Sequence, residues 1–163
     1  MTAAEGMEDC RKACGGHGFL QSSGLPELVN TYLQSPTVEG DNHMLPQQVV
    51  KVLIKLVQAV ANGDDLSDYK PCDSSGLIPS LQNICSGKRE TGLARSEDDL
   101  LDLECLVDAF RHRAARVLAQ VAEKLEKEVQ SQGKSLPQAW TACQVDMARA
   151  SRSYAQFLLL NNF

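Results

Sequence analysis

The stretch that decides the fold is residues 45–63, which read LPQQVVKVLIKLVQAVANG. Its apolar residues recur three and four positions apart, the spacing that places side chains on one face of a helix. The expected core face is Val49, Val52, Leu53, Leu56, Val57 and Val60, whereas Lys51, Lys55 and Gln58 fall on the other side. Because proline is tolerated only in the first turn, Pro46 places the start of the helix near His43, and Asn62-Gly63 should end it. The stretch thus predicts an amphipathic helix with one face in a core.

Helical patterns lie on both sides of this stretch, and we find no strand pattern. We expect helices over about 2–14, 26–33 and 96–132, and a last helix from Ser135 through Phe157. Ser35-Pro36 should close the second of these, since a residue before proline is pushed out of the helical region. The long helix should carry an apolar stripe of Leu100, Leu103, Val107, Phe110, Ala114, Val117, Val121 and Leu125. The expected fold class is all-α, built of helical bundle segments.

Residues 64–95 have the composition of a connection between two helical units. They are rich in Ser, Gly, Asp and Pro, with one apolar island from Leu77 to Ile84 that has room for a turn or two of helix. The helix that follows has a start signal at Ser96-Glu97-Asp98-Asp99, where acids occupy the first turn.

Charge and hydropathy exclude several classes of function. The net charge is -5, and Lys and Arg are scattered among acids with no basic stripe, so we expect no nucleic-acid partner. The longest apolar run near the C-terminus, Phe157 to Leu160, is too short to span a membrane, and the N-terminus has no signal-peptide architecture. We therefore expect a soluble protein made without a secretory signal.

Six cysteines in a chain of 163 residues without a signal peptide indicate reduced thiols. Cys10, Cys14 and His17 form a possible metal cluster, but zinc sites usually pair two such clusters and this chain has one. We expect small thiols buried on a helix face and no metal.

Two short motifs are candidates for chemistry. Glu39 stands beside Gly40 just ahead of the amphipathic helix, where a carboxylate can be held at a fixed depth and a flat ligand can approach the backbone. Asp41 or Asn42 can cap that helix. The second motif, Gly15-Gly16-His17-Gly18, should end the first helix, and its exposed N–H groups would suit a phosphate or a neighbouring backbone as well as a plain helix stop.

Three segments in this order resemble the signatures of the peroxisomal acyl-CoA oxidases, flavin-dependent relatives of the acyl-CoA dehydrogenases. They are EGMEDCRKACGGHGF at 5–19, SGLP at 23–26 and EGDN at 39–42. The resemblance covers residues 2 to about 60, with departures at Phe19, Val38 and 43–48. It implies that 1–63 is the end of the flavin-site helical domain, 64–95 a linker, and 96–163 the beginning of the C-terminal helical domain.

The resemblance implies an enzyme that converts fatty acyl-CoA and O2 to trans-2-enoyl-CoA and H2O2 with FAD as its cofactor. Glu39 would be the catalytic base and, with Gly40, would contact the substrate. The N–H of Glu39 would stabilise the charge that develops on the thioester oxygen. The cofactor would lie against Gly15, Gly16, His17 and Gly18, and near Asp41 and Asn42, and the complete enzyme would be a homodimer.

The resemblance also sets expectations for the chain by itself. It corresponds to a central to C-terminal portion of the family, so we expect weak or absent FAD binding and no activity from these residues alone. A peroxisomal location is implied by resemblance only, because the chain ends Asn161-Asn162-Phe163 and not in a peroxisomal tripeptide. The alternative is a non-catalytic helical interaction or dimerisation module derived from an oxidase.

Overall fold

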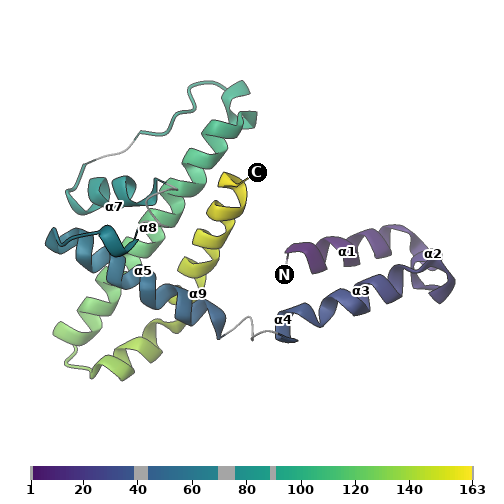
Figure 1. Ribbon diagram of the computed structural model, residues 1–163, viewed down its shortest axis with the longest axis horizontal. Helices are drawn as coiled ribbons and strands as arrows, with labels where there is room; N and C mark the ends of the chain where they lie inside the picture. The colour runs from purple at the N-terminus through teal and green to yellow at the C-terminus, as the bar shows by residue number, and fades with distance from the viewer. Residues whose placement is uncertain (1, 39–43, 70–75, 89–90, 163) are drawn as a thin grey trace. The chain divides into compact units, whose positions relative to one another are not determined.

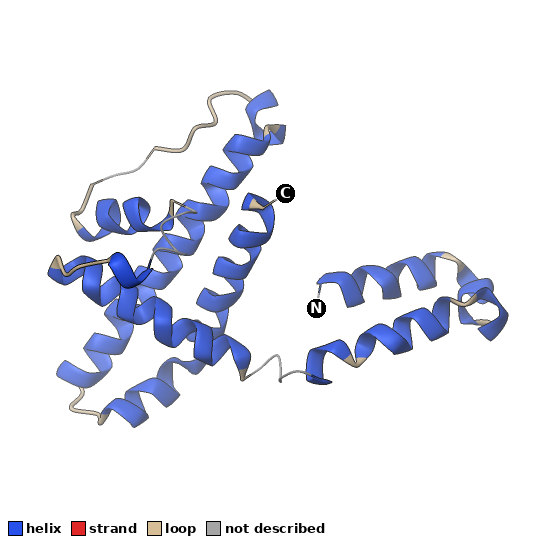
Figure 2. Ribbon diagram, in the orientation of Figure 1, coloured by secondary structure: helices blue, strands red, loops and turns tan. Residues whose placement is uncertain are grey.

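The structure, a computed structural model, describes residues 2–38, 44–69, 76–88 and 91–162. Helices make up most of these residues and none of them forms a strand (Figure 2), which confirms the all-α prediction. The chain divides into two compact units, residues 1–45 and 46–163. No helix in the described ranges is both long and apolar enough to cross a membrane.

The first unit is a helical hairpin. Its helices are α1 (Thr2–Ala13), α2 (Gly15–Phe19), α3 (Leu25–Leu33) and α4 (Ser35–Val38), with a 3₁₀ turn at Gln21–Ser23. Helix α1 packs against α2 and α3 (Figure 1). The prediction that Ser35-Pro36 closes α3 is only half right, because these residues also open α4. A proline in a first turn suits a helix, since its fixed φ is already helical and its missing N–H has no partner to lose.

The glycine cluster between α1 and α3 is a corner built as a short helix. Gly15 has a φ of 57°, a conformation that ends α1 as predicted. The remaining residues were expected in a turn, yet Gly16 to Gly18 are helical and lie in α2. Gly18 is buried, and a Cβ atom there would stand 1.9 Å from the carbonyl oxygen of Arg11. Only glycine lets α2 lie this close to the backbone of α1.

We expect Gly18→Ala to destabilise the hairpin by about 1–3 kcal/mol, the usual cost of overpacking, because its Cβ meets backbone that cannot rotate away. Hydrogen exchange of the α1 amides measures this effect. The matched control is Gly16→Ala, whose Cβ would meet no atom of the chain within 4 Å, so protection should be unchanged or higher. Equal protection in both variants would contradict the close approach at Gly18.

The second unit is a bundle of α5 (Leu45–Asn62), α7 (Leu77–Cys85), α8 (Leu103–Gln130) and α9 (Leu136–Asn161), with 3₁₀ turns at Ser67–Tyr69 and Asp98–Leu101. Helices α8 and α9 form the longest contact, and α7 packs on α8 (Figure 1). One hydrophobic core joins all four helices. Its largest fully buried side chains include Leu53, Leu56, Leu77, Leu81, Leu118, Met147 and Phe157.

Helix α5 exists where the sequence predicts it, with Pro46 in its first turn, but its buried face is rotated. Val50 and Ile54 are buried, whereas Val49 and Val52 are 40% and 52% exposed. The helix is apolar around more than half of its circumference, so two overlapping faces satisfy the same spacing. Burial in the core that α5 shares with α7, α8 and α9 selects the face centred on Leu53 and Val57. The predicted capping by Asp41 or Asn42 lies outside the described residues.

The compact units divide the chain at a different place from the predicted domains, whose boundaries stay predictions. Helix α5 shares a core with α7, α8 and α9, so the compact units divide between Leu45 and Pro46. The predicted linker is not only a connection, because Leu77, Ile78 and Leu81 of α7 are buried in that core. Assignment of residues 1–63 to a flavin-site domain stays a prediction.

The ends of α8 and α9 follow their capping groups. Helix α8 begins at Leu103, later than expected, because the side chain of Asp102 accepts a hydrogen bond from the N–H of Cys105 at 3.2 Å. The predicted start at Ser96 leads only into the 3₁₀ turn Asp98–Leu101, where the Asp99 carboxylate accepts a hydrogen bond from the N–H of Ser96 at 2.9 Å. Helix α9 begins as predicted, with a capping box between Ser135 and Gln138.

Candidate functional site

The α2 corner brings four predicted site residues together. Gly15 and Gly16 are exposed, and no heavy atom lies within 4 Å of the place where a Cβ of either would stand. His17 is also exposed, and its carbonyl oxygen accepts a hydrogen bond from the N–H of Leu20 at 3.3 Å. Gly18 differs from the others because it is buried against α1.

The difference in burial between Gly18 and Gly16 indicates that the two positions require glycine for different reasons. Gly18 is explained by packing inside the hairpin, whereas nothing in the described part of the chain explains Gly16. A glycine in a helix costs about 1 kcal/mol relative to alanine. Gly16 keeps a bare backbone at the surface, which is the kind of position where a ligand can come close to backbone N–H groups. The corner therefore fits the approach of an anionic group such as a diphosphate.

An ion pair on α1 lies beside the corner. The Glu8 carboxylate accepts hydrogen bonds from Nε and Nη2 of Arg11 at 2.7 and 2.6 Å, and Lys12 Nζ stands 3.6 Å away. The hydrogen bond from Arg11 holds the pKa of Glu8 down at about 2, so this carboxylate is ionised at neutral pH. In return, the Glu8 carboxylate raises the pKa of Arg11. The fixed pair leaves Lys12 as the more exposed cation of this turn.

A groove of about 620 Å³ runs between α1 and α3 and was not predicted from the sequence. It is lined by Glu8, Arg11, Phe19, Leu20, Gln21, Pro26, Val29, Asn30 and Leu33. The signal that could have found it is the spacing of Glu8 and Arg11, which places these two lining residues on one side of α1.

The cysteines correct one expectation and confirm another. Cys10 and Cys14 were expected to be buried, and both are exposed, because α1 is covered on one side only by α2 and α3. The five cysteines of the described residues carry free thiols, as predicted. Within those residues no three His, Cys, Asp or Glu side chains come together as metal ligands.

The other predicted site residues, Glu39, Gly40, Asp41 and Asn42, lie outside the described residues. The structure therefore neither brings them to the α2 corner nor separates them from it, and their roles stay predictions.

Comparison with known proteins adds two family models. The one described as "Acyl-CoA oxidase, C-alpha1 domain" matches residues 1–54, and the one described as "Acyl-CoA oxidase" matches residues 102–163. Both describe one kind of enzyme, and together they cover more than half of the chain. The chain belongs to the acyl-CoA oxidase family.

Curated acyl-CoA oxidases align with nearly the whole chain. Peroxisomal acyl-coenzyme A oxidase 1 of Rattus norvegicus is 32% identical over 165 residues, which cover 99% of this chain and 24% of that protein. The enzyme of the same name from Arabidopsis thaliana is also 32% identical, with 98% of this chain and 22% of that protein covered. The chain thus spans about a quarter of the length of the curated relatives it matches.

Solved acyl-CoA oxidases share the helical arrangement. Acyl-CoA oxidase 1 from Arabidopsis thaliana matches with a TM-score of 0.75 and 30% identity, covering 94% of this chain and 21% of that one. Acyl-CoA oxidase-1 of Caenorhabditis elegans, solved in complex with FAD and ATP, matches with a TM-score of 0.72 and 25% identity, covering 96% and 22%. The predicted fold, the C-terminal helical part of an acyl-CoA oxidase, is confirmed.

Proposed function

We propose that the chain is a portion of an FAD-dependent acyl-CoA oxidase that converts fatty acyl-CoA and O2 to trans-2-enoyl-CoA and H2O2 in fatty acid β-oxidation. Membership of the family supports the reaction class. The observation that carries the proposal is the match of two acyl-CoA oxidase family models to residues 1–54 and 102–163. Gly16, an exposed helical glycine at the corner between α1 and α3, offers bare backbone that a cofactor would approach. An anionic cofactor at the α2 corner gives that glycine a reason.

Residues of this chain would supply the base and part of the cofactor site. Gly15 and Gly16 would offer bare backbone to the diphosphate of FAD, with His17, Asp41 and Asn42 nearby. Gly18 acts by holding the corner in shape against Arg11. When bound, FAD supplies the acceptor for the hydride that leaves the substrate.

Glu39 would remove the proton next to the thioester carbonyl. That proton is weakly acidic, so the negative charge that develops on the carbonyl oxygen must be stabilised, and the backbone N–H of Glu39 is the proposed donor. Enclosure by cofactor and acyl chain raises the pKa of a carboxylate and makes it a stronger base. Gly40 would leave room for the substrate beside it.

The proposal also covers the cellular location and the oligomeric state of the enzyme. Relatives that match the whole chain are named peroxisomal, which supports a peroxisomal location. We propose a homodimer as the complete enzyme. The chain by itself should bind FAD weakly or not at all, since it spans about a quarter of its relatives.

A chimera tests the cofactor site. In it, residues 1–163 replace the segment of the rat relative with which they align. We expect the chimera to keep FAD through gel filtration and Gly16→Ala to weaken FAD binding at least about 10-fold, because the new methyl group occupies the space of the approaching diphosphate. A titration of the apo-chimera with FAD, followed by flavin fluorescence, measures the affinity.

The matched control for Gly16→Ala is Gly6→Ala. Gly6 is likewise exposed, helical and without a neighbour within 4 Å of a Cβ, but it stands in the middle of α1, away from the corner. If both variants and the parent chimera bound FAD with equal affinity, the proposal that FAD lies at the α2 corner would be wrong.

The second candidate function is a helical interaction module. Exposed apolar side chains in the first unit favour it, notably Phe19, Leu28 and Leu33, which are 75%, 55% and 49% exposed. Sedimentation of the purified chain separates the readings. Stable, stoichiometric dimers without flavin would support the module, whereas flavin in the chimera and a monomeric chain alone would support the enzyme.

A further inference from the structure

Helices α8 and α9 carry the same polar motif. Arg113, Arg116 and Gln120 on α8 have the spacing R-x-x-R-x-x-x-Q, and Arg149, Arg152 and Gln156 on α9 repeat it residue for residue. In a helix this spacing places the three side chains of each motif on one face. All four arginines are exposed.

Two contacts fix how the motifs meet across the helix pair. Nη1 of Arg113 donates a hydrogen bond to Oε1 of Gln156 at 2.9 Å, and Nζ of Lys124 lies 2.5 Å from Oδ2 of Asp146. These pairs define the antiparallel register of α8 and α9. In each pair, the residue number on α8 and the residue number on α9 have nearly the same sum. The same register places Gln120 beside Arg149, and both line one shallow depression of about 210 Å³. The two motifs are therefore related by an approximate two-fold axis.

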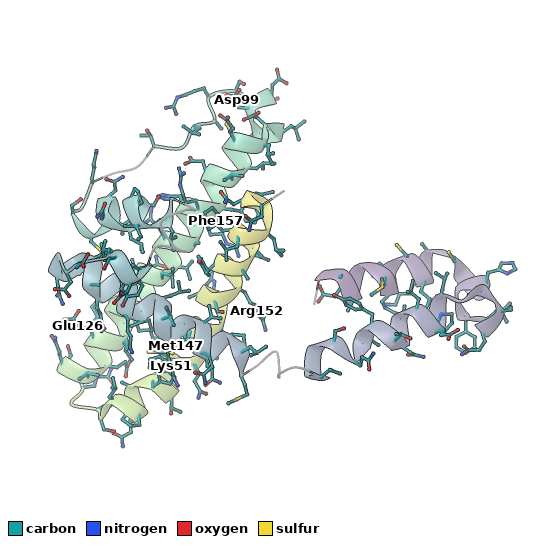
Figure 3. The ribbon with its side chains drawn as sticks, in the orientation of Figure 1. Lys51, Asp99, Glu126, Met147, Arg152 and Phe157 are labelled. Carbon is teal, nitrogen blue, oxygen red and sulfur yellow. The ribbon has the colours of Figure 1, made fainter. Side chains whose placement is uncertain are left out.

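The register makes the arginine face compact. At 1.5 Å per residue, the four arginines span roughly 11 Å along the helix axes, and neighbouring axes are roughly 8–10 Å apart. Figure 3 shows Arg152 on the outer side of α9, whereas Phe157 of the same helix lies toward α8. The face formed by Arg113, Arg116, Arg149 and Arg152 is here called the arginine face.

Within the described residues, no ion pair compensates the charge of the arginine face. Among the residues that the structure describes, no carboxylate forms an ion pair with any of its four members, and the nearby acid Asp146 is neutralised by Lys124. Arg113 contacts the neutral Gln156 and lies 5.8 Å from the ring centre of Phe110. Guanidinium groups keep their charge at any physiological pH. The sequence shows no such cluster, because the four arginines are divided between two segments 36 residues apart.

Apolar side chains extend the face on α9. Val145 and Leu159 are 83% and 61% exposed, and they continue the line of Arg149, Arg152 and Gln156 at steps of four and three residues. Along this exposed face of α9, an apolar residue is followed by two cationic residues and then by a second apolar residue. The surface is shallow, with a depression below the roughly 300 Å³ of an ordinary ligand pocket, so it suits an extended partner and not a small molecule.

We propose that the arginine face docks on an anionic phospholipid membrane. Arginine binds phosphate oxygens through two parallel hydrogen bonds, which a row of lipid headgroups offers at every position. Val145 and Leu159 enter the boundary between headgroups and acyl chains, as the apolar residues of an interfacial helix do. Clustered cations on an exposed helix pair are a recognised composition for such surfaces.

Co-sedimentation of the chain with vesicles tests the proposal. We expect binding to vesicles of phosphatidylcholine mixed with phosphatidylserine, little binding to phosphatidylcholine alone, and release at high salt. Arg149→Gln/Arg152→Gln should lower the partition coefficient roughly 30-fold, as expected for the loss of two charges near an anionic surface. Val145→Ser/Leu159→Ser should also weaken binding while leaving its salt dependence in place.

The matched control is Lys51→Gln/Lys55→Gln, which removes the same charge from the exposed side of α5. It should leave binding near the level of the unmodified chain, and circular dichroism should show all variants folded, since the changed residues are exposed. Equal loss in the control, or equal binding to neutral vesicles, would overturn the proposal. Arginine-dependent binding to polyglutamate, to a DNA duplex or to a second copy of the chain, without binding to vesicles, would overturn it in favour of that partner.

Discussion

Glu39→Gln in the chimeric oxidase should lower the rate of acyl-CoA-dependent H2O2 formation by about 10²- to 10⁴-fold, the range expected for loss of a general base. The amide is close to isosteric with the carboxylate but cannot take the α-proton, so the fold and FAD content should be unchanged. A coupled peroxidase assay at saturating fatty acyl-CoA measures the rate.

The control for Glu39→Gln is Glu27→Gln, the same chemical change at an exposed position of α3. It should leave the rate within about two-fold of the chimera, as expected for a group that makes no contact with the transition state. Normal turnover by the Glu39 variant would remove Glu39 from the role of base while leaving family membership intact.

Phe157→Ala should destabilise the second unit by about 3–5 kcal/mol, the cost of deleting a large buried aromatic side chain and leaving a cavity. Phe157 is fully buried between α9 and the rest of the core. Urea unfolding can be followed by the fluorescence of Trp140, the one tryptophan of the chain, which packs against that core. The signal therefore reports the second unit alone.

Leu159→Ala is the matched control for Phe157→Ala. Leu159 lies on the same helix but is 61% exposed, so its truncation should change the free energy of unfolding by less than about 0.5 kcal/mol. Similar losses in both variants would mean that α9 is not anchored through Phe157.

The presence of the helices was predictable because the spacing of apolar residues and the residues that start and stop helices agree over long segments. The last helix starts after Ser135 and the first helix ends just before Gly15, as the sequence predicts. Helix faces were harder to predict. On α5 the apolar surface is wide enough for two orientations. Of the stripe expected for the long helix, Leu103 and Leu100, which lies in the 3₁₀ turn before α8, are exposed, while Leu118 is fully buried. Only packing against partner helices chooses between such alternatives, and a single sequence does not contain that choice.

The candidate site shows a similar division. The resemblance selected all four residues of the α2 corner, but it could not distinguish the role of Gly18 from that of Gly16. Gly18 is required by its close contact with the backbone of Arg11, whereas a Cβ at Gly16 would meet no atom of the described chain within 4 Å. That distinction depends on the distance between two backbones. The arginine face was not predicted, because Arg113 and Arg149 are far apart in the sequence. They lie on the same surface only when α8 and α9 pair in the observed register.

Anaerobic mixing of fatty acyl-CoA with the FAD-loaded chimera tests the central claim most directly. We expect the absorbance of oxidised flavin to disappear without oxygen, and to return with release of H2O2 when O2 is admitted. An FAD-loaded chimera whose flavin stays oxidised, under conditions in which the parent rat enzyme is reduced, would show that these residues do not support acyl-CoA oxidation.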